Sequence, residues 1–397
     1  MTNKPPFAGE GARRVRLGDI ASVKAGNVAP KKGLFSERGI PFVRAGSLSR
    51  LLDGESPRSL ERIDKTTADK LGMHLFPEGT ILFAKSGMSC MTGNVYVLKE
   101  PCYVVSHLAC VAIDNTELTL YLKHYFRWNK PNALVENPSF PSIRLGKIKD
   151  MEIRLPDARQ IARWVSTLER IEGLMETHEH QLSLLDDLVK SRFVEMFGDP
   201  VENPMRLPCK AIASLGELKN GVNYRKGESG VEIRCLGVSD FGAKSELKDV
   251  TNLNYVSLAS PPSEENLLKD GDVVFVRSNG NKKLVGRCMS VYPGRKDVTF
   301  SGFCIRLRIT SDLVRIPYLV WSLRQPSSRE RLIGRGANIQ NLNQRILGEM
   351  HLPIPPLSLQ DAFLTFAAEV DKSRVVVQKQ IEKLQTLYDS LAQEYFG

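Results

Sequence analysis

The chain has 397 residues, of which 42% are hydrophobic and 25% charged, a composition typical of a soluble globular protein. That length suffices for two domains that each bury a core. Lysine and arginine number 55 against 45 acidic residues, and the net charge of +10 favours a polyanionic partner, with simple solubility as the alternative. The first residues lack the apolar core of a signal peptide, and no run of about 18 apolar residues follows. These features exclude a membrane protein and predict a cytoplasmic location.

The first predicted elements are short strands that are rich in β-branched and aromatic residues and bounded by glycine or proline. They cover residues 80–85, 95–98 and 103–106 and, later in the chain, 272–277. Helix-like apolar stretches precede Pro131 and Pro326, which would stop them. Strands and helices do not alternate regularly, so we expect a mixed α+β fold and no doubly wound parallel sheet.

Several blocks of sequence recur in the second half of the chain. EGTILFAKSG at 78–87 matches DGDVVFVRSNG at 270–280, and MEIRLPDARQ at 151–160 matches HLPIPPLSLQ at 351–360. A long amphipathic helix is predicted after each member of the second pair, and both helices end alike, as SRFVEMFG and LAQEYFG. The repeat predicts four segments in order. They are a domain at 1–158, a helix at 159–199, a second domain at 200–356 and a second helix at 357–397.

Both predicted helices carry a seven-residue apolar repeat, which is typical of a coiled-coil seam. Because the repeat extends beyond about 25 residues, we expect the two helices to pair. The alternative is that each helix only covers the sheet of its own domain. A helix of about 38 residues would be roughly 57 Å long. The expected seam consists of Ile161, Leu168, Met175, Leu182, Val189 and Met196 in the first helix, and of Phe363, Val370, Val377, Leu384 and Leu391 in the second.

Motifs for catalysis are absent or incomplete. Asn137-Pro138-Ser139-Phe140 is close to the motif with which DNA methyltransferases hold a flipped base, but Ser139 replaces the middle proline and no cofactor loop precedes it. The sequence has no GxxxxGK[ST] phosphate-binding loop. The six histidines form no HExxH motif, and the seven cysteines are scattered, which indicates reduced core residues and no metal site. We therefore expect no catalytic residues in this chain.

The segments RLGDIASVKAG at 16–26, GIPFVRAGSL at 39–48 and EGTILFAKSG, with the helix endings MFGDP and EYFG, resemble the specificity subunit of type I restriction-modification enzymes. The resemblance covers essentially the whole chain, although EIRCLGVSDFG in the second domain departs from PFVRAGSLS in the first. It implies two similar target recognition domains of mixed α and β structure. It also implies that the two helices pair as an antiparallel coiled coil with internal pseudo-two-fold symmetry and space the domains.

The same resemblance implies a function. The chain would be a non-catalytic, sequence-specific DNA-binding subunit that directs methyltransferase and restriction subunits to a bipartite, asymmetric site on double-stranded DNA. Two methyltransferase subunits and motor-nuclease subunits are the expected partners, and they would bind S-adenosylmethionine, ATP and Mg. Two alternatives remain open. One is a stand-alone DNA-modifying enzyme, a methyltransferase or nuclease with an unrecognised site, and the other is a coiled-coil scaffold with no role on DNA.

Residues that would contact DNA are sought among cations and amides on glycine-rich loops at strand ends. Arg and Lys can pair with guanine, Asn and Gln with adenine, and further cations hold phosphates. Ordinary solvated loops are the alternative. The candidates are Lys85, Ser86 and Gly87; their counterparts Arg277, Ser278, Asn279, Asn281, Lys282 and Lys283; Tyr224, Arg225 and Lys226; Arg44 and Ser47; and Lys31 and Lys32. Candidates for an exposed docking surface for methyltransferase subunits are Arg163, Glu169, Arg192 and Phe193.

Overall fold

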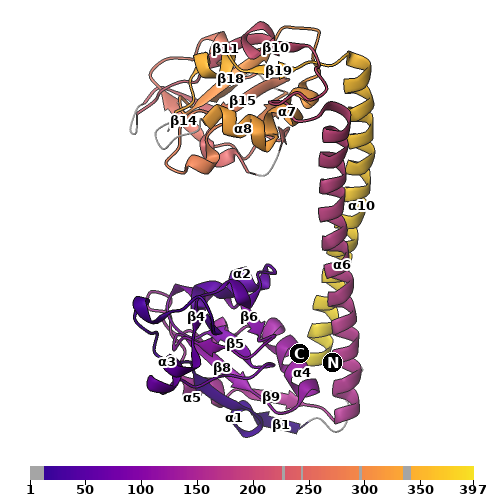
Figure 1. Cartoon of the computed structure of the whole chain (residues 1–397). Helices are drawn as coiled ribbons and strands as arrows, with labels where there is room; N and C mark the ends of the chain where they lie inside the picture. The colour runs from indigo at the N-terminus through magenta and orange to yellow at the C-terminus, as the bar shows by residue number, and fades with distance from the viewer. Residues whose placement is uncertain (1–12, 226–228, 243–244, 295–296, 334–340) are drawn as a thin grey trace, which may run out of the picture. The chain divides into compact units, whose positions relative to one another are not determined.

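A computed structural model describes residues 13–225, 229–242, 245–294, 297–333 and 341–397. The chain divides into two compact units (Figure 1). The first unit comprises residues 1–180 and 378–397, and the second comprises residues 181–377. None of the described helices has the length and apolar character of a membrane span.

The first unit contains a four-stranded sheet of order β2-β8-β5-β6, a three-stranded sheet of order β4-β3-β7 and the pair β1-β9. The four-stranded sheet is antiparallel, and its inner strands read ILFA and LACVA, the continuous apolar runs expected of strands covered on both faces. The strands are β1 (Arg13–Arg16), β2 (Ser22–Ala25), β3 (Ile40–Val43), β4 (Arg62–Ile63), β5 (Ile81–Ala84), β6 (Val95–Val97), β7 (Tyr103–Val104), β8 (Leu108–Ala112) and β9 (Glu152–Leu155). The short helices are α1 (Leu17–Ile20), α2 (Leu48–Leu52), α3 (Lys65–Lys70), α4 (Thr116–Trp128) and α5 (Leu145–Lys149).

The second unit repeats this topology. Its sheets have the orders β11-β18-β15-β16-β13, β14-β12-β17 and β10-β19, so among the described strands only the edge strand β13 lacks a counterpart. The strands are β10 (Cys209–Ala211), β11 (Gly216–Asn220), β12 (Val231–Leu236), β13 (Glu246–Leu247), β14 (Tyr255–Leu258), β15 (Asp272–Val276), β16 (Cys288–Val291), β17 (Val298–Phe300), β18 (Cys304–Ile309) and β19 (His351–Pro353). The short helices are α7 (Ile316–Arg324), α8 (Pro326–Ile333) and α9 (Gln344–Gly348). The α+β fold expected from the sequence is confirmed.

A buried tyrosine anchors the main short helix of each unit. In the first unit Tyr121 of α4 donates its hydroxyl hydrogen bond to the Arg154 carbonyl on β9. In the second unit Tyr318 of α7 donates to the Pro353 carbonyl on β19 at 3.0 Å. Each of these strands runs directly into a long helix, so the same contact fixes the start of that helix in both units.

The two long helices, α6 (Ala158–Phe197) and α10 (Leu357–Phe396), run antiparallel to each other. In the first unit Trp164, near the start of α6, stacks on Tyr395, near the end of α10, with ring centroids 4.6 Å apart. In the second unit Phe193, near the end of α6, packs edge-on against Phe363, near the start of α10, at 5.4 Å. Early residues of one helix therefore meet late residues of the other, which is the antiparallel pairing expected.

Each unit takes one half of each long helix into its hydrophobic core. Leu168 of α6 and Ala392 of α10 belong to the core of the first unit, and Val189 and Val370 belong to that of the second. Each helix therefore packs against both units, and the alternative in which each helix covers only its own domain is wrong. All eleven residues of the expected seam are buried or half-buried.

Candidate nucleic-acid interface

The loop after β5 in the first unit is held by backbone hydrogen bonds from two other segments. The Lys85 amide donates to the His107 carbonyl at 2.9 Å, and the Lys85 carbonyl accepts from the Ile143 amide at 2.7 Å. Ser86 forms a β-bridge with the same segment. Gly87 has a φ of 78°, a left-handed conformation that side chains rarely adopt. The loop backbone is thus fixed, with Lys85 half-exposed and Gly87 exposed.

The loop after β15 in the second unit is held in the same way. The Arg277 amide donates to the Phe303 carbonyl at 2.8 Å, and the Arg277 carbonyl accepts from the Leu342 amide at 2.8 Å. Ser278 forms the matching β-bridge, with Asn341. Two loops that the sequence repeat pairs therefore occupy equivalent positions in their units, each presenting a cation as its first residue.

The second loop continues with amides that shape its own backbone. The side-chain oxygen of Asn279 accepts from the Asn281 amide at 2.7 Å, and that of Asn281 accepts from the Lys283 amide at 3.0 Å. These turns use the side-chain oxygens as acceptors and do not use the side-chain NH₂ groups. Asn281 and Lys283 are exposed, whereas the side chain of Lys282 lies outside the described residues.

The segment that contains Tyr224 and Arg225 lies beside this loop. Val222, just before it, accepts a hydrogen bond from the Gly302 amide at 2.7 Å, and Gly302 also accepts from the Arg277 guanidinium at 3.2 Å. Tyr224 is 41% exposed, and its partial burial raises the pKa of the phenol. The structure therefore brings two candidate segments together, whereas Lys226 lies outside the described residues.

The corresponding segment of the first unit carries the lysine pair. The Asn27 carbonyl accepts from the Ser106 amide at 2.7 Å, just as the Val222 carbonyl accepts from the Gly302 amide in the second unit. Lys31 and Lys32 follow and are both exposed. Their ammonium groups are therefore available to a polyanion.

Arg44 and Ser47 are less suited to contact a ligand. Arg44 Nε donates to a carboxylate oxygen of Glu61 at 2.6 Å, and the guanidinium lies 5.2 Å from the centroid of the Phe35 ring. Ser47 is 5% exposed. The Arg44 charge is already paired and the Ser47 hydroxyl is buried, so neither contributes to the interface in this conformation.

Of the residues expected to form an exposed docking surface on the helices, Phe193 is misplaced. It is fully buried between Phe363 and Tyr318, so the expectation that it is exposed was wrong. Arg163 is exposed, and Arg192 pairs with Glu195 at 2.8 Å within α6. The seven-residue repeat predicts only which residues face the partner helix. It could not show that Phe193, which lies beside the seam, is buried against the domain.

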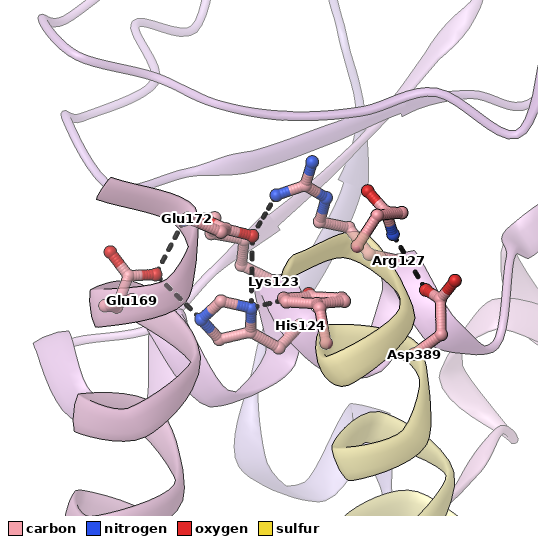
Figure 2. Close-up of polar contacts among 8 residues, drawn as sticks. Lys123, His124, Arg127, Glu169, Glu172 and Asp389 are labelled. Carbon is pink, nitrogen blue, oxygen red and sulfur yellow. Dashed lines mark hydrogen bonds and ion pairs between the residues drawn. The ribbon is translucent and has the colours of Figure 1, made fainter. Parts of the chain in front are cut away.

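A charged cluster that the sequence did not indicate ties α4 to both long helices (Figure 2). Lys123 Nζ lies 2.6 Å from a carboxylate oxygen of Glu169 and of Glu172. The fully buried His124 has Nε2 2.7 Å from Glu169 and Nδ1 2.8 Å from the Tyr388 hydroxyl. The histidine and two carboxylates are spaced closely enough to hold a metal ion. Lys123 already places a positive charge between the carboxylates, so we interpret the cluster as an ion-pair network.

Comparisons with known proteins agree on one family. The family model for the type I restriction modification DNA specificity domain matches residues 10–184. Over 348 residues the chain is 27% identical to the type I restriction enzyme StySPI specificity subunit of Salmonella potsdam, covering 82% of this chain and 74% of that protein. It is 28% identical over 178 residues to the MjaIX specificity subunit of Methanocaldococcus jannaschii, covering 43% of this chain and 40% of that protein.

Solved structures share the fold along the whole chain. The S subunit of a type I restriction-modification system from M. genitalium aligns over 100% of this chain and 99% of its own, with a TM-score of 0.51 and 14% identity. A chain from a study of complex assembly and conformational transition of the type I R-M system aligns over 99% of this chain and 100% of its own, with a TM-score of 0.61 and 16% identity. The matched domain lies in the first unit and the second unit repeats its topology, so the two units share the fold of the type I restriction-modification specificity subunits that this chain resembles.

Proposed function

We propose that this chain recognises a bipartite, asymmetric site on double-stranded DNA and directs methyltransferase and restriction subunits to it. The observation that carries the proposal is an arrangement that occurs once in each unit. The first residue of the loop is a cation, and its amide and carbonyl are both held by backbone hydrogen bonds from other segments. We call this arrangement the loop frame. The two frames present different side chains, Lys85-Ser86-Gly87 in one and Arg277-Ser278-Asn279 in the other. Two units with different loops would read two different half-sites.

In this proposal the segments at 1–158 and 200–356 are the target recognition domains, and those at 159–199 and 357–397 are the spacers. Two methyltransferase subunits and motor-nuclease subunits would dock on the complex in the cytoplasm and would bind S-adenosylmethionine, ATP and Mg. This chain would carry out no catalysis itself. The coil seam residues would set the separation of the half-sites.

The loop residues have distinct expected roles. Arg277 can pair with two acceptors of a guanine edge, and the NH₂ group of Asn279 can donate to an adenine edge or a phosphate. Lys31, Lys32 and Lys283 are exposed ammonium groups of the kind that neutralise phosphates. The net charge of +10 supports this polyanionic partner.

DNA affinity of the assembled complex, measured against salt concentration, tests the proposal. The logarithm of affinity should fall linearly with the logarithm of salt. Lys85→Ala and Arg277→Ala should each weaken specific binding by about ten-fold. The matched controls Lys99→Ala and Lys269→Ala remove exposed lysines, one just after β6 and one just before β15, and should change affinity little.

Three results would contradict the proposal. A salt-independent affinity would favour the scaffold alternative, because a scaffold has no phosphate contacts to lose. Methylation or cleavage of DNA by the purified chain alone would favour the stand-alone enzyme. Equal effects of the loop variants and their controls would remove the loops from the interface.

A further inference from the structure

One residue occupies the same position beside the recognition loop in both units. In the first unit it is His107, in the turn between β7 and β8, and in the second it is Phe303, in the turn between β17 and β18. Each turn is closed by a backbone hydrogen bond, from Leu108 to Val105 at 3.0 Å and from Cys304 to Ser301 at 2.8 Å. The carbonyl of the turn residue accepts from the amide of the loop cation in both units. The backbone environment of the two residues is therefore the same, and only the side chains differ.

The turn lies at the centre of the candidate interface in each unit. On one side it binds the loop cation, and on the other it binds the segment after β2, through Asn27, in the first unit and the segment after β11, through Val222, in the second. Those two neighbours are the segments that carry the other candidate DNA contacts. A side chain at the tip of the turn would thus lie between the loop and that segment.

Both side chains point to solvent, with different chemistry. His107 is exposed, and its Nδ1 lies 2.8 Å from the Ser86 hydroxyl, which leaves Nε2 as the outer polar atom. Phe303 is 62% exposed, although phenylalanine gains free energy from burial. This exposed ring follows Gly302, whose carbonyl accepts from the Arg277 guanidinium, and burial in a core does not explain its presence there.

We propose that this turn residue is a specificity-determining position, at which His107 and Phe303 contact base edges of different half-sites. The inference rests on the proposed function. An imidazole can donate to, or accept from, the major-groove edge of a base pair. A phenyl ring cannot hydrogen-bond there, but it can pack against the thymine methyl group, so the half-site read by the second unit contains an A·T pair under Phe303.

The first test maps methylated bases in cells that co-express the full chain with its methyltransferase subunit. His107→Phe should alter one position in one half of the motif, and Phe303→His should alter one position in the other half. Methylation at the original motif should fall at least ten-fold in each case. His351→Phe makes the first change at an exposed position outside the two loop frames, and Leu313→His places a histidine at an exposed apolar position there; both should leave the motif intact.

The second test changes the DNA and begins with the wild-type complex. Uracil lacks only the methyl group of thymine, and replacing the thymine under Phe303 should weaken binding of the wild-type complex about four-fold. The same replacement should have no effect on the Phe303→His complex, which assigns the contact to this residue. Phe303→Leu, which keeps an apolar contact, should retain the motif.

The outcomes separate the inference from the proposed function. A two-part motif that both turn variants leave unchanged would overturn the inference and leave the proposed function standing. So would a second half-site without an A·T pair, or one insensitive to uracil. Absence of any two-part motif with the wild-type chain would overturn the proposed function itself.

Discussion

Replacing Glu172 by Gln should destabilise the first unit by about 3 kcal/mol at neutral pH. Burial of this carboxyl, whose side chain is 13% exposed, acts to raise its pKa. The hydrogen bond from His124 and the charges of Arg127 and Lys123 outweigh burial and lower the pKa from 4.5 to about 2. Each pKa unit corresponds to about 1.4 kcal/mol, so the ionised form of Glu172 stabilises the fold by about 3 kcal/mol.

The effect should depend on pH with a defined sign. The pKa is lower in the folded state, so the stabilisation is complete above about pH 4.5, where the carboxyl is ionised in both states. It is lost as the pH falls through about 2, where the folded state also takes up the proton. The difference between wild type and Glu172→Gln should therefore be about 1 kcal/mol smaller at pH 3.5 than at pH 7.

Urea unfolding followed by tryptophan fluorescence measures this difference. The chain has three tryptophans, and a Trp321→Phe background leaves only Trp128 and Trp164, which both belong to the first unit. The matched control Glu176→Gln removes an exposed carboxylate one turn later on α6 and should cost less than about 0.5 kcal/mol. Equal costs for the two variants, or a cost of Glu172→Gln that does not change with pH, would refute the reasoning.

Three further predictions concern packing and thiol chemistry. Gly26→Ala would place a Cβ 2.3 Å from two backbone carbonyl oxygens and should cost about 1–3 kcal/mol in thermal unfolding, whereas Gly33→Ala, with nothing within 4 Å, should be neutral. Phe363→Ala should destabilise the second unit by about 3–5 kcal/mol in urea unfolding, and a cost as small as that of the exposed Leu359→Ala would contradict its place in the core. A thiol reagent should label Cys209 alone among the seven cysteines of the native chain and all seven in denaturant, because burial raises the pKa of the other six thiols. Labelling of a second native thiol at the same rate would contradict this.

Local patterns in the sequence predicted the elements well. The apolar runs that became β5 and β15 are bounded by glycines, and the seven-residue repeats marked α6 and α10 along their length. Sheet order could not be predicted in the same way, since the pairing of β2 with β8 joins segments that are far apart in the chain. The division of each long helix between the two units could not be predicted either. It results from the antiparallel pairing of the two helices, and the sequence of one helix does not determine that pairing.

The candidate interface was predicted in part. The two loops were identified because the repeat aligned Lys85 with Arg277, and the structure gives both the same backbone frame. His107 and Phe303 were missed because their place beside the loops depends on hydrogen bonds across the sheet. Aligning the repeat through HLACVA and FCIRLR would have paired them. Ser47 was proposed from residue type alone, which carries no information on its burial.

The central claim is that two units read two half-sites, and a methylation map tests it most directly. The wild-type chain and the Arg277→Ala variant should each be co-expressed with the methyltransferase subunit, and modified adenines should be mapped across the genome by single-molecule sequencing. We predict a two-part motif with a constant spacer, and in the variant a loss of selectivity at one half only. Methylation that does not depend on this chain, or a variant that relaxes both halves equally, would contradict the account.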